Sequence, residues 1–175
     1  AGSEGRVMAC ETIGITHPLL TDVTNAEFAA SMGADLVLLN MFDVQNPLIQ
    51  GLPSVEKKET VREVKRLTGC LVGINLEPVD DSIVSENAQD LWSMSEGRRA
   101  TADNAALAQE MGVDMIVLTG NPGNGVSNDA IVHSLQEISK RVGDKITLAA
   151  GKMHASGVIG EGGENIITKE DIRLF

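Results

Sequence analysis

Short apolar runs alternate with amphipathic stretches along the chain. The runs have strand length and lie at residues 6–12, 36–39, 71–76, 115–118 and 146–150. Between them, apolar residues spaced three and four apart predict helices at 24–32, 55–67, 101–111 and 128–142. The run at 115–118 is continuous, which is typical of a strand that is covered on both faces. Five strands alternating with helices predict an α/β fold with a parallel sheet and right-handed crossovers.

Capping residues mark the starts of several helices. Thr24 is followed three residues later by Glu27, which is the spacing of a capping box. Thr168 and Asp171 repeat that spacing and predict a further helix near the end of the chain. Ser54 is expected to cap the helix at 55–67.

The clearest pattern lies in residues 101–128, which begin with the predicted helix at 101–111. Its buried face is expected to consist of Ala105, Leu107, Ala108 and Met111, and Gly112 is expected to end it in a left-handed conformation. Residues 29–40 repeat the same design of helix end, glycine, aspartate and apolar strand. The repetition supports a series of similar βα units.

The glycine-rich loop that follows strand 115–118 is a candidate anion site. It carries few side chains, so its backbone N–H groups can approach a ligand closely, and Ser127 is expected to cap the next helix and point its positive end toward the loop. Such a place suits phosphate or carboxylate. The alternative is that the glycines only form a turn. The candidate residues are Gly120, Asn121, Gly123, Gly125 and Ser127.

Two architectures fit one α/β domain that spans residues 1–175. One is the first five units of an eight-fold βα barrel, whose exposed sheet edges would need a partner or the missing units. The other is an open doubly wound parallel sheet. The chain begins without Met and stops where a helix starts, so we expect it to be a segment of a longer protein.

The composition argues against nucleic acid and the membrane as partners of this chain. The net charge of −11 and the aromatic content of 2% argue against nucleic acid, which needs a basic surface and stacking side chains. No apolar run is long enough to span a membrane. The only two cysteines, Cys10 and Cys70, fall in strand-like runs and are expected to be buried free thiols, which suits a cytoplasmic location. We expect a homo-oligomer that acts on a small anionic substrate.

Polar residues follow each apolar run, at the strand ends where ligands bind in either architecture. Asn75 is notable because an amide inside an apolar strand needs hydrogen-bond partners, either neighbouring backbone or a ligand. The polar residues at the strand ends are Glu11, Thr12, Asn40, Asp43, Asn75, Glu77, Thr119, Asn121, Lys152 and His154.

Carboxylates near these ends are candidate metal ligands. Glu77, Asp80 and Asp81, together with Glu11 or Asp43, could hold Mg²⁺ through carboxylates and waters. The alternative is that they are solvated acids on an acidic protein. The metal set expected here is Glu11, Asp43 and Glu77.

The end of the fifth strand supplies candidate proton-transfer groups. Lys152 and His154 are two residues apart and would point the same way on a continuing strand. The lysine could bind an anion or act as a base, and the histidine could move a proton near neutral pH. The alternative is an exposed strand end without a catalytic role.

Several stretches resemble a known family. EGRVMACETI, TDVTNAEFAASMGADLVLLNMFDV, LVGINLEPVD and RRATADNAALAQEMGVDMIVLTGNPGNGVSN are similar to bacterial phosphoenolpyruvate phosphonomutase-like proteins of the isocitrate lyase barrel group. The second half is also similar to the BtpA family at Gly73, Ile74 and Asn75, at 119–121, and at Lys152 and His154. The Lys-Lys-Cys-Gly-His type loop of characterised phosphonomutases is absent, and GKMH stands at the end of the fifth run.

The resemblance implies a (β/α)₈ TIM barrel of which this chain holds about five units. It implies an isomerase or lyase in which Mg²⁺ stabilises an enolate, with Lys152, His154 and Glu77 as catalytic residues and with Asn40, Asn75 and Thr119 in the substrate site. Similarity to BtpA implies instead a non-catalytic scaffold for assembly of a larger complex. A third possibility is a phosphosugar-binding barrel, whose phosphate site usually follows strands seven and eight.

Overall fold

Five parallel strands form one sheet in the computed structural model, which describes residues 5–79, 94–120, 127–152 and 167–175. The strands lie in chain order, β1-β2-β3-β4-β5, and every neighbouring pair is parallel. The elements are β1 (Ala9–Ile13), α1 (Asn25–Ser31), β2 (Leu36–Asn40), η1 (Lys57–Glu59), α2 (Thr60–Thr68), β3 (Leu71–Leu76), η2 (Glu96–Arg98), α3 (Ala102–Met111), β4 (Met115–Gly120), α4 (Asn128–Val142), η4 (Gly143–Lys145), β5 (Thr147–Lys152) and α5 (Lys169–Leu174).

This strand order decides between the two predicted architectures. A doubly wound sheet reverses its strand order at a switch point, whereas the order here never reverses. The open doubly wound alternative is therefore wrong. The prediction of a partial (β/α) barrel with about five units is confirmed.

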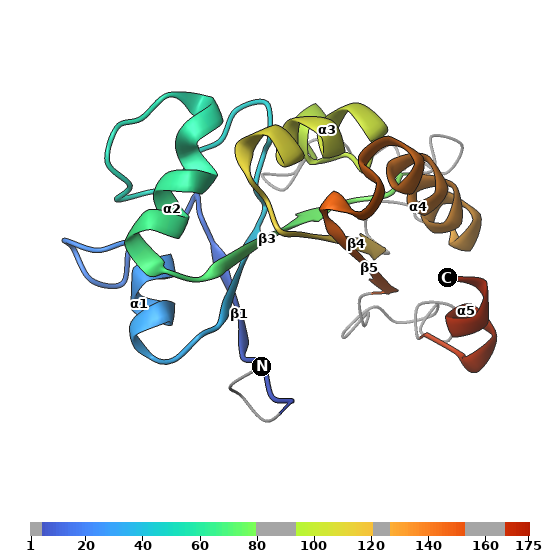
Figure 1. Ribbon diagram of the computed structural model, residues 1–175, viewed down its shortest axis with the longest axis horizontal. Coiled ribbons are helices and arrows are strands. Elements are labelled where there is room, and N and C mark those ends of the chain that lie inside the picture. The colour runs from blue at the N-terminus through green and yellow to red at the C-terminus, as the bar shows by residue number, and fades with distance from the viewer. Residues whose placement is uncertain (1–4, 80–93, 121–126, 153–166) are drawn as a thin grey trace.

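The helices α1 to α4 lie on one side of the sheet, and neighbours in the chain pack against each other (Figure 1). Side chains that point toward these helices from β2, β3 and β4 are completely buried, including Leu39, Ile74 and Leu118. Burying one such side chain contributes about 1.5–3 kcal/mol. The hydrophobic core therefore lies between the sheet and its helices.

The other face of the sheet is less covered than the sequence predicted. In β4, Ile116 and Leu118 are fully buried, but Met115 and Val117 on the opposite face are only half-buried. The prediction that this strand is covered on both faces is wrong, because in the described part of the chain all four long helices pack on one side. The opposite, concave side would be the interior of a closed barrel.

Helix starts follow the sequence in three places and differ in one. Both capping boxes form, at Thr24 with Glu27 and at Thr168 with Asp171, and Ser127 accepts a hydrogen bond from the N–H of Ala130. Ser54 does not cap a helix: a 3₁₀ turn begins after Glu56, and α2 starts only at Thr60.

The buried face of α3 contains three of the four predicted residues, Ala105, Ala108 and Met111, and differs at the fourth. Leu107 is 39% exposed, and Asn104 is buried in its place. The amide of Asn104 caps the preceding turn by donating to the carbonyls of Glu96 and Arg99 at 2.7 and 2.9 Å. Gly112 ends α3 with φ of 92°, as predicted.

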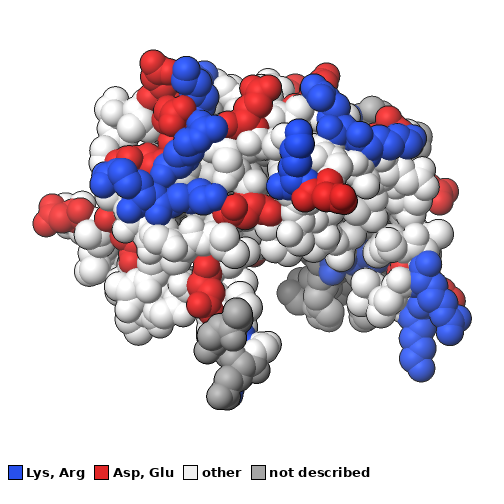
Figure 2. Space-filling view, in the orientation of Figure 1, with Lys and Arg blue, Asp and Glu red and all other residues white. Residues whose placement is uncertain are grey.

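Surface charges alternate in sign over the helices (Figure 2). Pairs three residues apart join Arg62 to Glu59 and Arg66 to Glu63 on η1 and α2. The Lys and Arg side chains of residues 55–67 therefore form a solvated helix face. Exposed ion pairs of this kind contribute little to stability. Among the described helices, none combines the length and apolar character needed to traverse a bilayer.

Both cysteines are free thiols. Cys70 is buried as expected, whereas Cys10 on the edge strand β1 is only half-buried. The difference follows from position, because β1 has a neighbouring strand on one side only among the described residues.

Candidate functional site

The concave face at the C-terminal ends of the strands gathers a small set of polar side chains. Register pairs Ile13 with Asn40 and Asn75 with Val117, so residues at these levels lie side by side across the sheet. Asn40, Asn75 and Thr119 occupy the face opposite the fully buried Leu39, Ile74 and Leu118. Three of the predicted substrate-binding residues therefore share one face and one end of the sheet.

Asn75 is the least satisfied of these residues. Its carbonyl oxygen Oδ1 is buried and has no hydrogen-bond partner in the described structure. Leaving a buried polar group without a partner costs about 1–3 kcal/mol. The carbonyl oxygen of Asn75 therefore does not bond to neighbouring backbone, which was one of the two alternatives that the sequence left open.

Asn40 is held in place by its neighbours. Its Nδ2 donates to Oε1 of Glu11 at 2.7 Å, and its Oδ1 accepts from the N–H of Met41 at 2.8 Å. Met41 has φ of 58°, in the left-handed region that a non-glycine residue rarely adopts. Glu11 thus orients an amide at the strand ends, and its own carboxylate is partly engaged.

Glu77, directly after β3, is buried and forms an ion pair with Arg98. The backbone supports the pair, because Glu77 N–H donates to the carbonyl of Arg98 at 2.8 Å and Ala100 N–H donates to the carbonyl of Glu77 at 2.9 Å. Removing one partner of a buried ion pair leaves an uncompensated charge, which typically costs 3–5 kcal/mol. The positive charge of Arg98 thus balances the negative charge of Glu77, the predicted catalytic carboxylate.

Arg98 is the important residue near the site that the sequence analysis did not select. The sequence feature that could have indicated Arg98 is the Arg-Arg pair shortly before α3. The same pair is equally compatible with an exposed turn. The tertiary structure brings this segment onto the end of β3, where a parallel bridge joins Glu77 and Arg99 beside the ion pair of Glu77 with Arg98.

Asp43 has a structural role in the loop after β2. Its Oδ1 accepts hydrogen bonds from the N–H groups of Gln45 and Asn46 at 2.8 and 2.9 Å. Gly97 packs so closely that an added Cβ would lie 1.8 Å from that oxygen. One oxygen of the predicted metal ligand is thus committed to the backbone.

The three predicted Mg²⁺ ligands do not form a ready site. Within the described ranges, no three Asp, Glu, His or Cys side chains gather closely enough to hold a metal. Glu11 is bonded to Asn40, Asp43 to its own loop, and Glu77 to Arg98. These residues do not by themselves fit Mg²⁺, and Asp80 and Asp81 lie outside the described residues.

Lys152 points away from the concave face. It pairs in register with Gly120, and it shares the helix-facing side of β5 with Leu148 and Ala150, which pack against the core. Its Nζ lies 3.4 Å from Oδ2 of Asp171 on α5, and both side chains are about nine-tenths buried. The geometry gives Lys152 a structural partner, and its catalytic role stays a prediction.

Asp171 joins three elements. It accepts from the N–H of Thr168 at 2.8 Å and from Nδ2 of Asn128, the first residue of α4, at 2.6 Å. These hydrogen bonds, led by the one from the backbone of Thr168, hold the pKa of Asp171 below its ordinary value, and Lys152 adds a smaller effect in the same direction. The first turn of α4, the end of β5 and α5 are thus fixed together.

The remaining predicted residues fall into two groups. Thr119 is half-buried and Gly120 is buried at the end of β4, and Ser127 caps α4. The others lie outside the described residues; they are Asn121, Gly123, Gly125 and His154.

A parallel sheet in strict chain order, helices on its outer side and polar residues at the carboxyl ends of its strands define the class of βα-barrel proteins. The chain belongs to the family described as "Domain of unknown function (DUF7916)", which it matches over residues 1–175. No curated protein matches its sequence.

Solved barrels share the fold at low sequence identity. A "putative dihydrodipicolinate synthetase" from Pseudomonas aeruginosa is 10% identical with a TM-score of 0.53, over 96% of this chain and 51% of that one. A GH27 β-L-arabinopyranosidase from Geobacillus stearothermophilus is 16% identical with a TM-score of 0.47, over 84% of this chain and 48% of that one. The chain therefore spans about half the length of these barrels, and the likeness concerns the fold alone.

Proposed function

We propose that the concave end of this sheet is the substrate site of an enzyme that acts on a small anionic compound, such as a phosphorylated or 2-oxo acid. The observation that carries the proposal is the buried, unpartnered carbonyl oxygen of Asn75. A polar group kept at such a cost suits a place where a ligand supplies the missing hydrogen bond. The carboxyl ends of parallel strands are where barrel enzymes bind their substrates.

The neighbouring residues support this role. The Asn75 amide can accept from a substrate hydroxyl and donate to a carboxylate or phosphate oxygen. Asn40, oriented by Glu11, and Thr119 offer further polar groups on the same face. The buried pair of Glu77 and Arg98 places a compensated charge at the end of β3.

The finer proposal is phosphoenolpyruvate phosphonomutase-like chemistry, in which a C–C or P–C bond is cleaved or rearranged through an enolate. It rests on the family resemblance of the sequence. Mg²⁺ would supply stabilisation of an enolate oxygen, but the described carboxylates do not fit the ion by themselves. Each ligand is therefore tested both with and without Mg²⁺.

A thermal-shift series tests the site. The protein is melted with phosphoenolpyruvate, phosphonopyruvate, oxalate or phosphate, each with and without Mg²⁺. A ligand at 100 times its Kd stabilises the folded state by about 2.7 kcal/mol and raises the Tm. We expect at least one of these anions to do so, and a rise that needs Mg²⁺ with oxalate or a pyruvate analogue would support enolate chemistry.

Asn75→Leu links the shift to the site. This substitution should abolish the ligand-induced rise in Tm, because it removes the amide that is proposed to bind the ligand. It should not lower the Tm of the free protein, because the buried oxygen that it removes has no hydrogen-bond partner. Gln136→Leu, on the exposed side of α4, is the matched control and should keep the rise. A rise that survives Asn75→Leu, or no rise with any anion, would contradict the proposal.

One observation favours a second candidate, a scaffold without catalytic activity like that implied by the BtpA resemblance. An apolar groove lies between β1 and α1, away from the concave face. Exposed apolar surface of this kind is often a protein-binding site. A protein partner bound in this groove would support the scaffold function.

A further inference from the structure

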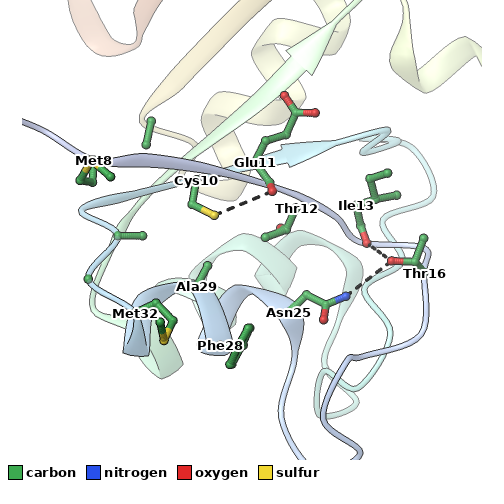
Figure 3. Close-up of a pocket in the computed structure, with 13 residues that line it drawn as sticks. Met8, Cys10, Glu11, Thr12, Ile13, Thr16, Asn25, Phe28, Ala29 and Met32 are labelled. Carbon is green, nitrogen blue, oxygen red and sulfur yellow. Dashed lines mark hydrogen bonds between the residues drawn. The ribbon is translucent and has the colours of Figure 1, made fainter.

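A smaller cavity lies among the helices, apart from the apolar groove between β1 and α1 (Figure 3). It has a volume of about 300 Å³ and lies between the start of α3 and the middle of α4. Thr101 and Ala102 line it at the start of α3, and His133, Ser134 and Glu137 line it from α4. A mixed polar and apolar lining and a volume at the lower end of the range for ligand sites suit a small polar molecule.

Ser134 is a buried polar residue of this lining. It is only 9% exposed. Its hydroxyl makes no hydrogen bond with any residue in the described ranges, although a serine inside a helix can bond to the carbonyl four residues earlier. Buried polar groups are normally partnered, and a hydroxyl can both donate and accept. A polar ligand in the cavity would therefore satisfy Ser134.

The wall at the start of α3 is positively polarised. The first N–H groups of a helix have no partner within the helix, and the helix dipole adds partial positive charge there. Arg99 lines the cavity just before α3, and its Nη1 lies 3.6 Å from Oε1 of Glu96. A guanidinium has five N–H donors, so an arginine can bind a carboxylate ligand and an acidic neighbour together. This wall therefore suits a carboxylate.

The facing wall on α4 carries a negative charge. Glu137 lines the cavity, and its Oε1 accepts from Nζ of Lys140 at 2.8 Å. This hydrogen bond holds the pKa of Glu137 below its ordinary value, so the group is ionised at neutral pH. Glu77 also lines the cavity, but Arg98 balances its charge. The cavity thus has one positive wall and one negative wall.

We propose that this cavity binds a free α-amino acid. The carboxylate of the ligand lies against Arg99 and the N–H groups at the start of α3, and the ammonium group lies against Glu137. Ser134 bonds to the ligand between the two walls. A simple anion leaves Glu137 without a partner in the ligand, and a simple amine does the same for Arg99, so only a molecule with both charges uses both walls. The site goes beyond the proposed function, because Asn75 is not part of its lining.

His133 provides a local signal for binding, because this residue lines the cavity. Isotopically labelled protein is titrated with each proteinogenic amino acid, and the ring resonances of the histidines are followed by NMR. His133→Gln assigns the signal among the three histidines of the chain. We expect a saturable shift of the His133 signal with at least one amino acid. The analogues that lack its amine or its carboxylate, which are propionate and ethylamine in the case of alanine, should bind at least ~10-fold more weakly.

Two conservative substitutions test the contacts. Ser134→Ala removes the hydroxyl and should weaken binding about fivefold without lowering the Tm of the free protein. Glu137→Gln removes the negative charge and should weaken binding at least ~10-fold. The matched controls are Ser139→Ala and Asp129→Asn, which are exposed on the same helix and should leave the affinity unchanged.

Three outcomes overturn the proposal. These are no saturable shift of His133 with any amino acid, equal binding of the analogue that lacks the amine, and unchanged affinity in both Ser134→Ala and Glu137→Gln. In Asn75→Leu the His133 shift should be the same as in wild type. Failure of the amino-acid site is thus distinguishable from failure of the substrate site at Asn75.

Discussion

Asn75 and Lys152 both follow apolar strand residues, yet their side chains have opposite surroundings. Asn75 faces the concave side with an unpartnered oxygen, whereas Lys152 faces the helices and meets Asp171 at 3.4 Å. In a strand the side chains alternate between faces, so a shift of one position exchanges site and core. At the residue scale, function here depends on which face a side chain takes.

At the same scale, Asp171 is expected to make the stability of the fold depend on pH. Its hydrogen bonds hold the pKa of the folded state below the ordinary value of 3.8. A carboxyl group with a depressed pKa contributes stability that is present above the ordinary value and is lost as pH falls through the folded-state pKa. Asp171→Asn cannot ionise, so wild type should melt higher than the variant at neutral pH, and the gap should shrink only below about pH 4. A gap that stays constant to pH 2, or equal melting at pH 7, would show that the charge of Asp171 does not stabilise the fold.

At the scale of elements, helix starts separate good sequence signals from ambiguous ones. Thr24 and Thr168 begin helices because the Thr side chain caps a backbone N–H while the acid three residues later reaches back. Ser54 lacks an acid or amide three residues later, and its helix begins six residues further on, after a 3₁₀ turn. The complete two-residue motif was reliable, whereas a serine before a charged stretch was not.

The capping difference can be measured as a pair of substitutions. Thr24→Ala removes a side chain that accepts from Glu27 N–H at 3.1 Å and is almost completely buried, so it should destabilise the protein by about 1–2 kcal/mol in urea unfolding. Ser54→Ala removes no helix cap and should change stability by less than about 0.5 kcal/mol. If the two cost the same, the capping box is not what stabilises α1.

At the scale of the whole molecule, the sheet has a protected centre and two less covered edges. β2, β3 and β4 each pair on both sides and are fully covered on the helix-facing side, whereas β1 and β5 pair on one side within the described sheet. Exposed edges are places where another strand can pair. The two edge strands are therefore where a strand of another barrel unit, or of a second copy in a homo-oligomer, would pair.

Amide hydrogen exchange checks this gradient in the 175-residue chain. Backbone amides of β2 to β4 should exchange more slowly than those of β1 and β5, because opening an edge strand breaks fewer hydrogen bonds and uncovers less apolar surface. Mass spectrometry of peptides that contain each strand gives the comparison. Protection of β1 equal to that of β3 would indicate that a strand from another copy already pairs with it.

The sequence by itself determined the βα series, the bounds of β3 and α4, the two capping boxes and the polar strand ends. These are local properties: apolar runs, the 3.6-residue period and backbone hydrogen bonds between residues three or four apart act within one element. Asn75 could be selected for the same reason, since an amide within an apolar run is visible without any contact.

Only the tertiary structure decided the strand order, the partners of the charged residues and the face of each strand that is covered. The pair of Glu77 with Arg98 and the pair of Lys152 with Asp171 join residues 21 and 19 positions apart. Their partners depend on how separate elements pack, and many partners are compatible with the same local pattern. The order that excludes a doubly wound sheet likewise comes from pairing between strands that short-range patterns do not specify.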